Sequence, residues 1–81
     1  MNKPTKIIER KLGRENAYGL ADTDKKIIEI DPRQKPKTYL DTLIHEAVHL
    51  AFPEVNETRV RKATKIIREV LWEHKYRKVT L

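Results

Sequence analysis

Two histidines four residues apart, His45 and His49, have the residue type and spacing best suited to chemistry in this chain. Residues four apart on a helix lie on the same face, so both imidazoles can reach one metal ion. Glu46 lies about 100° further around the helix axis, where it can act as a base without coordinating the metal. Two ligands and a general base in His-Glu-x-x-His spacing are typical of zinc hydrolases. The motif therefore predicts a metal-dependent hydrolase.

The neighbours of the motif help to separate a metal site from two unrelated surface histidines. Ala47 and Val48 lie between the histidines and Leu50 follows them, and all three are uncharged. A partly buried metal helix requires such residues, whereas an ordinary solvated helix face does not. We therefore favour metal binding.

A third ligand is needed because catalytic zinc usually takes three protein ligands and keeps one position for water. The chain has no cysteine, so this ligand must be a histidine or a carboxylate. Glu57 is the first choice, because it follows His49 by eight residues and lies on the shoulder of the next helix's apolar face. Glu54 is the second choice. His74 is the third, because about 25 Å of helix would separate it from Glu57.

Helical periodicity predicts one helix around the motif and a second helix after it. Thr38 is the expected N-cap of the first helix, with Asp41 in a capping-box position, and Pro53 ends the helix. Its apolar face is expected to pack on a sheet, away from the histidines, and comprises Leu40, Leu43, Ile44, Ala47 and Ala51. The second helix should start after Asn56 and run to about Lys75. Its expected core face comprises Val60, Ala63, Thr64, Ile67, Val70 and Leu71.

Three segments before the motif have the alternation or the β-branched residues typical of strands. They span residues 6–11, 17–21 and 26–30, with turn-forming aspartates at 22–25 and a linker at 31–37. The sequence thus predicts a small α+β fold. A three-stranded antiparallel sheet should precede the two helices, the first of which carries the metal motif.

Size and composition limit the class of protein. The 81 residues predict a single small domain, 1–81, with a thin core. The lack of cysteine excludes disulfides and thiolate zinc sites. No apolar stretch suits a signal peptide or a membrane span, so the cytoplasm is the expected compartment. The net charge of +6 favours acidic surfaces such as nucleic acid.

The segment from Tyr39 to His49, preceded by the strand at 26–30 and followed by Glu57, resembles the core of a minimal zincin metallopeptidase. A glutamate as third ligand makes it similar to the gluzincins, including the small ImmA/IrrE-like peptidases. The residues just before His45 resemble the SprT-like family. SprT-like enzymes have a third histidine downstream, and ImmA/IrrE-like proteins place their glutamate farther along. The resemblance is therefore to the zincin group, with the exact family open.

This resemblance implies a zinc-dependent peptidase, an endopeptidase rather than an exopeptidase, acting on a protein or peptide substrate. His45, His49 and Glu57 would hold Zn²⁺ and leave its fourth position open. The metal lowers the pKa of a bound water, and Glu46 takes the proton as the water attacks the peptide carbonyl.

The resemblance also nominates supporting groups. The strand at 26–30 would pair with extended substrate. Asp41, if it is not simply the helix cap, could bond to the other ring nitrogen of His45. The side chains able to stabilise the oxyanion are Tyr18, Tyr39, Tyr76 and His74.

The second helix also suggests a different class of function. A basic stripe that ends in an aromatic residue comprises Arg61, Lys65, Arg68 and Trp72. Such a stripe could hold a phosphate backbone and stack a base. A solvated helix face explains the same residues, and we favour it. The alternative to the hydrolase is therefore a small basic nucleic-acid-binding module with a structural or vestigial metal site.

Overall fold

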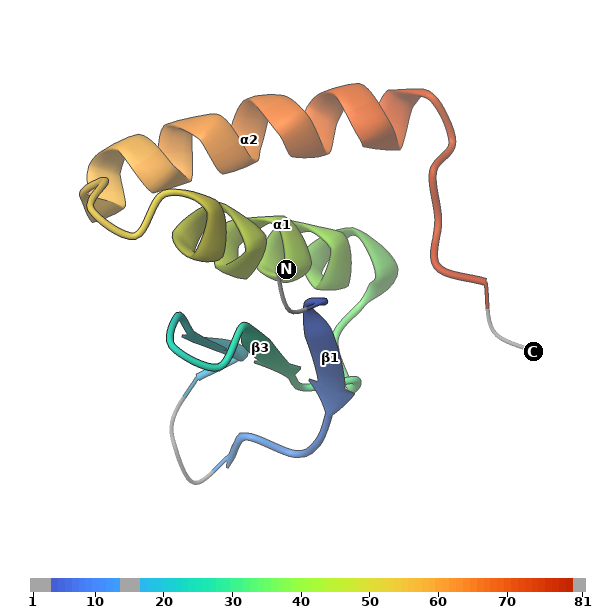
Figure 1. Ribbon diagram of the computed structural model, residues 1–81. Coiled ribbons are helices and arrows are strands. Elements are labelled where there is room, and N and C mark those ends of the chain that lie inside the picture. The colour runs from blue at the N-terminus through green and yellow to red at the C-terminus, as the bar shows by residue number, and fades with distance from the viewer. Residues whose placement is uncertain (1–3, 14–16, 80–81) are drawn as a thin grey trace.

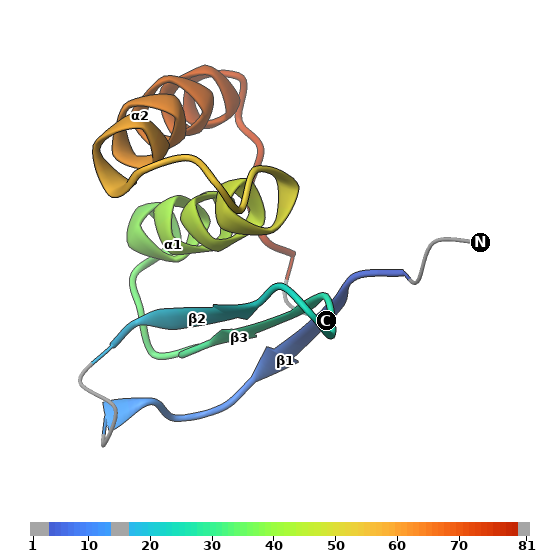
Figure 2. The ribbon, with the colours of Figure 1, turned by 60° about the vertical axis from the view of Figure 1, so that its left-hand side comes forward.

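Three strands are followed by two helices in the computed structural model, which describes residues 4–13 and 17–79. The elements are β1 (Lys6–Glu9), β2 (Gly19–Asp22), β3 (Ile27–Ile30), α1 (Pro36–Ala51) and α2 (Glu57–Glu73). They stack in three layers, with α1 between the sheet and α2 (Figures 1 and 2). The prediction of an α+β fold with three strands and then two helices is confirmed. Neither of these helices is long and apolar enough to cross a membrane.

The sheet is mixed, with the strand order β1-β3-β2. β2 pairs antiparallel with β3, but β1 pairs parallel with β3, so the prediction of an all-antiparallel sheet is wrong for β1. The short turn between β2 and β3 makes an antiparallel hairpin, whereas the longer connection from β1 allows β1 to reach the far edge of β3. β3 is therefore the central strand. Its predicted role as a free edge for substrate is also wrong.

The hairpin turn explains where β3 begins. The Asp22 carboxylate accepts hydrogen bonds from the backbone N–H groups of Asp24 and Lys25, both at 3.1 Å. Lys26 has a φ of 54°, in the left-handed region that ends the turn. β3 consequently starts at Ile27, one residue later than predicted.

The fully buried core is small. Its largest side chains are Leu12, Ile28, Ile30 and Val60. The loop after β1 is fixed beside this core by Asp31, whose carboxylate accepts a hydrogen bond of 3.0 Å from the backbone N–H of Leu12. Arg33 also donates two side-chain hydrogen bonds to that carboxylate, at 2.9 and 2.6 Å. Asp31 thus ties the end of the central strand to two loops.

α1 begins at Pro36, with Lys35 as its N-cap, and no side chain caps it. Proline suits this first position because its missing N–H would have no helical partner there. The predicted capping box of Thr38 and Asp41 is therefore wrong, since both residues lie inside the helix. The Asp41 carboxylate instead accepts a hydrogen bond of 2.6 Å from Arg68 of α2.

The predicted apolar face of α1 is only partly correct. The buried residues of the helix are Tyr39, Thr42 and Ile44. Ala47 and Ala51, which were expected to pack on the sheet, are exposed. The reason is that α1 contacts the sheet on one side and α2 on another, so its buried surface is split between two directions.

α2 begins as predicted, because the Asn56 side chain accepts a hydrogen bond of 2.9 Å from the backbone N–H of Arg59. Val60 and Thr64 are buried against the rest of the molecule. Ile67 and Val70, predicted as core, are 40% and 56% exposed. Of the described helices and strands only α1 lies against α2, so one arc of the helix is buried and the neighbouring apolar arc is not.

Candidate metal site

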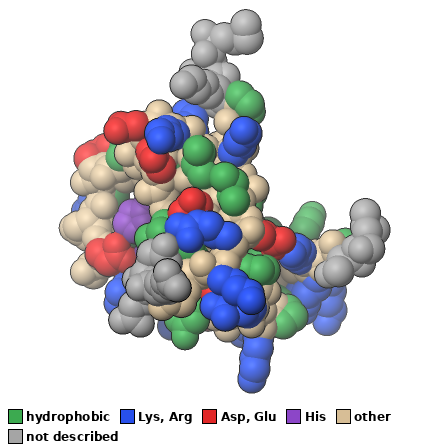
Figure 3. Space-filling view, turned by 90° about the horizontal axis from the view of Figure 1, so that it is seen from below, with side chains coloured by type: hydrophobic (Ala, Val, Ile, Leu, Met, Phe, Trp, Pro, Cys, Tyr) green, Lys and Arg blue, Asp and Glu red, His purple; other side chains and the backbone are tan. Residues whose placement is uncertain are grey.

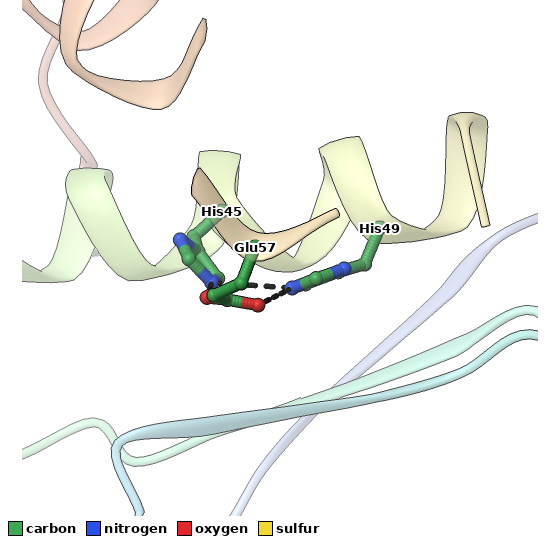
Figure 4. A group of neighbouring side chains, drawn as sticks. All are labelled: His45, His49 and Glu57. Atoms are coloured by element: carbon green, nitrogen blue, oxygen red, sulfur yellow. Dashed lines mark hydrogen bonds and ion pairs between the residues drawn. The ribbon is translucent and has the colours of Figure 1, made fainter. Parts of the chain in front are cut away.

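The candidate site forms where the first turn of α2 lies beside the middle of α1. The chain reverses direction after Pro53, and this brings Glu57 back to the histidines. The Glu57 carboxylate oxygens lie 2.6 Å from His45 Nε2 and 3.0 Å from His49 Nε2. The two Nε2 atoms are 3.2 Å apart. Figure 4 shows the three side chains pointing toward one another from the two helices.

The geometry of these three groups fits a single metal ion. Their potential ligand atoms all lie within 4.8 Å of one another. Tetrahedral zinc with bonds of 2.0–2.1 Å separates its ligand atoms by about 3.3 Å. The contacts here are 2.6, 3.0 and 3.2 Å, so the ligand atoms would have to move apart, Glu57 and His45 the most, when an ion binds. Two protonated Nε2 atoms only 3.2 Å apart would crowd their hydrogens toward the same carboxylate. A cation between three lone pairs removes that conflict. Two imidazoles with one carboxylate are also a donor set that suits Zn²⁺.

An open pocket of about 290 Å³ lies beside the cluster. Glu46 and His45 line it from α1, Gly19 lines it from the start of β2 with Tyr18 just before that strand, and Arg61 lines it from α2. A space-filling view from the sheet side shows histidine surface next to a hollow, with acidic side chains nearby (Figure 3). One potential ligand, His45, and the predicted base, Glu46, therefore line the same open space, which a substrate can enter.

The two glutamates of the site differ in their electrostatics. Burial raises the pKa of Glu46 above its ordinary value, although the charge of the neighbouring imidazoles opposes the shift. For Glu57, partial burial by itself would raise the pKa. The charges of His45 and His49 and the hydrogen bonds from His45 and Arg61 outweigh that effect, so the pKa of Glu57 is lowered. A raised pKa suits a group that takes up a proton, and a lowered one suits a ligand that stays ionised.

The other candidates for the third ligand lie outside this cluster. Glu54 is exposed in the loop between the helices and does not join the group formed by His45, His49 and Glu57. His74 is the C-cap of α2, at the opposite end of that 17-residue helix from Glu57. Of the three candidates, the structure brings only Glu57 to the histidines.

Of the groups nominated for the oxyanion, only Tyr18 lines the pocket beside Glu46. The Tyr39 hydroxyl donates a hydrogen bond of 2.6 Å to Glu9. Burial and this hydrogen bond raise the pKa of Tyr39 to about 12. Tyr76 lines a different pocket together with Tyr39. The positions of these tyrosines in the fold therefore distinguish Tyr18 from the other candidates for the oxyanion, which residue type alone could not do.

The predicted basic stripe does not form one outward surface. Arg68 points to α1, where it pairs with Asp41. The guanidinium carbon of Arg77 lies 3.3 Å from the centre of the Trp72 ring and covers a face that a base would need. Arg61 lies 3.5 Å from Glu57, at the candidate site. Sequence reasoning missed this position, although the four-residue spacing from Glu57 was a signal for it.

Comparison of the chain with protein-family models, with curated proteins and with solved structures finds no match. The case for a function therefore depends on the chemistry of the site.

Proposed function

We propose that this chain is a zinc-dependent metallopeptidase of the endopeptidase kind. The observation that carries the proposal is the convergence of His45, His49 and Glu57 within 4.8 Å, beside an open pocket lined by Glu46. The resemblance of the His-Glu-x-x-His segment to the zincin group supports it.

In this proposal His45, His49 and Glu57 hold the zinc ion, and Glu46 is the general base. Bound zinc supplies Lewis acidity toward a substrate carbonyl and makes a water molecule more acidic. Glu46 accepts a proton from the attacking water and passes it to the leaving amine. Tyr18, which lines the same pocket as Glu46, would donate a hydrogen bond to the developing oxyanion.

We place the substrate along β2. β2 pairs with β3 on one side, and Gly19 at its start borders the pocket that holds Glu46. An extended peptide can add to such a strand edge through main-chain hydrogen bonds. This position replaces the expectation for residues 26–30, because β3 already has a strand on each side.

Metal analysis and peptide hydrolysis together test the proposal. Protein purified without chelators should contain about one zinc per chain. It should cleave an unstructured protein such as casein, and 1,10-phenanthroline should abolish the cleavage. Glu46→Gln should lower kcat/KM by about 100-fold or more while retaining zinc. Glu54→Gln is the matched control and should change neither property, since Glu54 lies outside the cluster.

The outcomes separate the metal site from the reaction. A chain that binds no zinc at micromolar concentrations rejects both. Stoichiometric zinc without any cleavage rejects the peptidase and retains the metal site. Cleavage that survives Glu46→Gln shows that Glu46 is not the base.

A further inference from the structure

α2 has an apolar surface that no other described part of the chain covers. Ile66, Ile67 and Val70 are 57%, 40% and 56% exposed, and they neighbour one another on the helix. α2 forms an outer layer of the molecule and, among the described helices and strands, packs only on α1 (Figures 1 and 2). Scattered apolar side chains are normal on a surface, but a contiguous apolar patch points to a partner.

The spacing of this surface is that of a helix-pairing seam. Starting from Arg59, steps of four, three, four and three residues lead to Ala63, Ile66, Val70 and Glu73, and we call these five residues the α2 seam. Alternating steps of three and four bring side chains into line along one helix face, as in coiled coils. The centre of the seam is apolar. Its two ends are exposed and carry opposite charges.

The charges show how a partner would fit. Arg59 and Glu73 each lie seven residues from Ile66, on opposite sides of it. We propose that the α2 seam binds a second copy of this chain, with the two α2 helices antiparallel about a two-fold axis at Ile66. That axis sets Arg59 against Glu73 of the partner subunit at both ends of the contact. Parallel pairing would oppose like charges at both ends, which disfavours it. A self-complementary surface of this kind is what a two-fold dimer requires.

The dimer leaves the candidate metal site open. Glu57 and Ile66 are nine residues apart, which at about 100° per residue places them on opposite sides of α2. The proposal therefore does not depend on the proposed function. A single pair of helices buries less area than a standard protein interface, so the dimer should be weak, with a Kd of about 10–100 µM.

A single introduced thiol tests the geometry, because the chain has no cysteine. Ile66→Cys should form a disulfide-linked dimer under mild oxidation, since the axis brings the two copies of position 66 together. Lys65→Cys is the matched control, because the exposed side chain at position 65 lies about 100° away around the helix from that of Ile66. The Lys65→Cys protein should therefore remain monomeric. Equal cross-linking of both variants would reject the proposed axis.

Sedimentation equilibrium with charge variants tests the partner and the orientation. Wild type should dimerise reversibly between micromolar and millimolar concentrations. Arg59→Glu should weaken the dimer about tenfold, because it sets like charges together at both ends. Adding Glu73→Arg should restore the wild-type Kd in an antiparallel dimer, because opposite charges again face each other at both ends. In a parallel dimer like charges face each other in all three proteins, so Arg59→Glu would cause no comparable loss and there would be nothing to restore. Thermal melts of each variant check that the fold is unchanged.

A wild-type chain that stays monomeric throughout this range would overturn the proposal, including one that instead binds lipid vesicles. So would a double variant that dimerises no better than Arg59→Glu alone.

Discussion

Glu57 is the residue that joins the two helices at the candidate site. Its oxygens lie 2.6 and 3.0 Å from the imidazoles of α1, while its backbone begins α2. A metal held by all three side chains would cross-link the helices. It would then stabilise the folded state by an amount that grows with the logarithm of its affinity, because the site does not exist in the unfolded chain.

Removing Glu57 should therefore affect metal binding and folding together. We expect Glu57→Ala to weaken zinc binding by about 100-fold. At saturating zinc, this loss corresponds to about 2.7 kcal/mol of unfolding free energy. For a chain of this length, the melting temperature should fall by about 10 °C or more. Competition with a chelator of known affinity, beside thermal melts, measures both effects.

Glu54→Ala is the control for this experiment, because Glu54 is exposed in the adjacent loop. It should leave both the zinc affinity and the melting temperature unchanged. If Glu54→Ala weakens zinc binding and Glu57→Ala does not, the third ligand has been assigned to the wrong glutamate.

Sequence could identify some site residues because their placement depends on local geometry alone. His45, Glu46 and His49 share about one turn of helix, so their mutual arrangement follows from helical spacing. Glu57 follows after a short, sharp turn. Arg61 was missed as a pocket residue, because its direction depends on how α2 is rotated about its axis against α1. Helical spacing alone does not determine how α2 is rotated about its axis.

At the scale of elements, the contact between β2 and α1 positions Glu46, the proposed base. The small residues of β2, Gly19 and Ala21, are less exposed than Leu20 and Asp22, and α1 contacts this strand. A Cβ atom on Gly19 would lie 2.6 Å from Thr42 Cγ2 and 3.1 Å from Glu46 Cγ. Glycine is therefore needed here for space, since its φ is not positive. The strand can come this close to Glu46 only because the side chain is absent.

Gly19→Ala should consequently damage the site without removing any ligand. Thr42 cannot yield easily, because it is buried and its hydroxyl donates a hydrogen bond of 2.6 Å to Gln34. We expect a loss of about 1–3 kcal/mol in unfolding free energy. The displacement of Glu46 should lower kcat by about tenfold or more, with zinc content unchanged. Urea unfolding and peptide cleavage measure the two effects.

Two further variants identify the cause of this effect. Thr42→Ser removes the obstructing methyl group, so Gly19→Ala combined with Thr42→Ser should recover part of the loss. Gly13→Ala is the control glycine, because its added Cβ would meet only Arg33 Nη2, at an ordinary 3.5 Å. A Gly19→Ala protein as stable and active as wild type would show that the strand is not held close to the helix.

The elements were predictable where local periodicity determines them. Both helices follow from apolar spacing, and the hairpin follows from the turn chemistry of Asp22. The pairing of β1 with β3 was not predictable in this way, because those strands are distant in sequence. The exposure of Ile67 and Val70 was missed for a related reason. Periodicity shows that an arc of α2 is apolar, but not whether this molecule or a partner covers it.

At the scale of the whole molecule, Asp31 connects the end of β3 to the loop after β1 and to the residue just before β2. Its backbone N–H donates a hydrogen bond of 2.9 Å to the Tyr18 carbonyl, and its carboxylate accepts from Leu12 and Arg33. Both ends of the connection between β1 and β2 therefore meet at this residue. The pKa of Asp31 lies well below its usual range, and the largest cause is the pair of side-chain hydrogen bonds from Arg33. The backbone N–H groups of Leu12 and Arg33 lower it further.

A lowered pKa in the folded state makes this stabilisation depend on pH in a definite direction. The ionised Asp31 stabilises the fold above the pKa of an unfolded aspartate, about 3.9, and the effect is lost as pH falls below that value. Asp31→Asn should therefore be less stable than wild type at neutral pH. The difference in unfolding free energy should shrink steadily between about pH 5 and pH 2. Urea unfolding at a series of pH values measures that difference.

The difference in unfolding free energy between wild type and Asp31→Asn isolates the effect of Asp31 from that of the other titrating groups. Glu9 and Glu29 also have lowered pKa values, and the largest cause is a hydrogen bond from Lys78 to Glu9 and from Arg10 to Glu29. Both proteins contain these two glutamates, so their contributions cancel in the difference. Asp24→Asn, in the exposed hairpin turn, is the control for removing one aspartate, and its free energy of unfolding at neutral pH should stay close to that of wild type. A difference between wild type and Asp31→Asn that stayed constant down to pH 2 would mean that the charge of Asp31 does not stabilise the fold. The loops would then be held by the shape of its hydrogen bonds alone, which asparagine can partly reproduce.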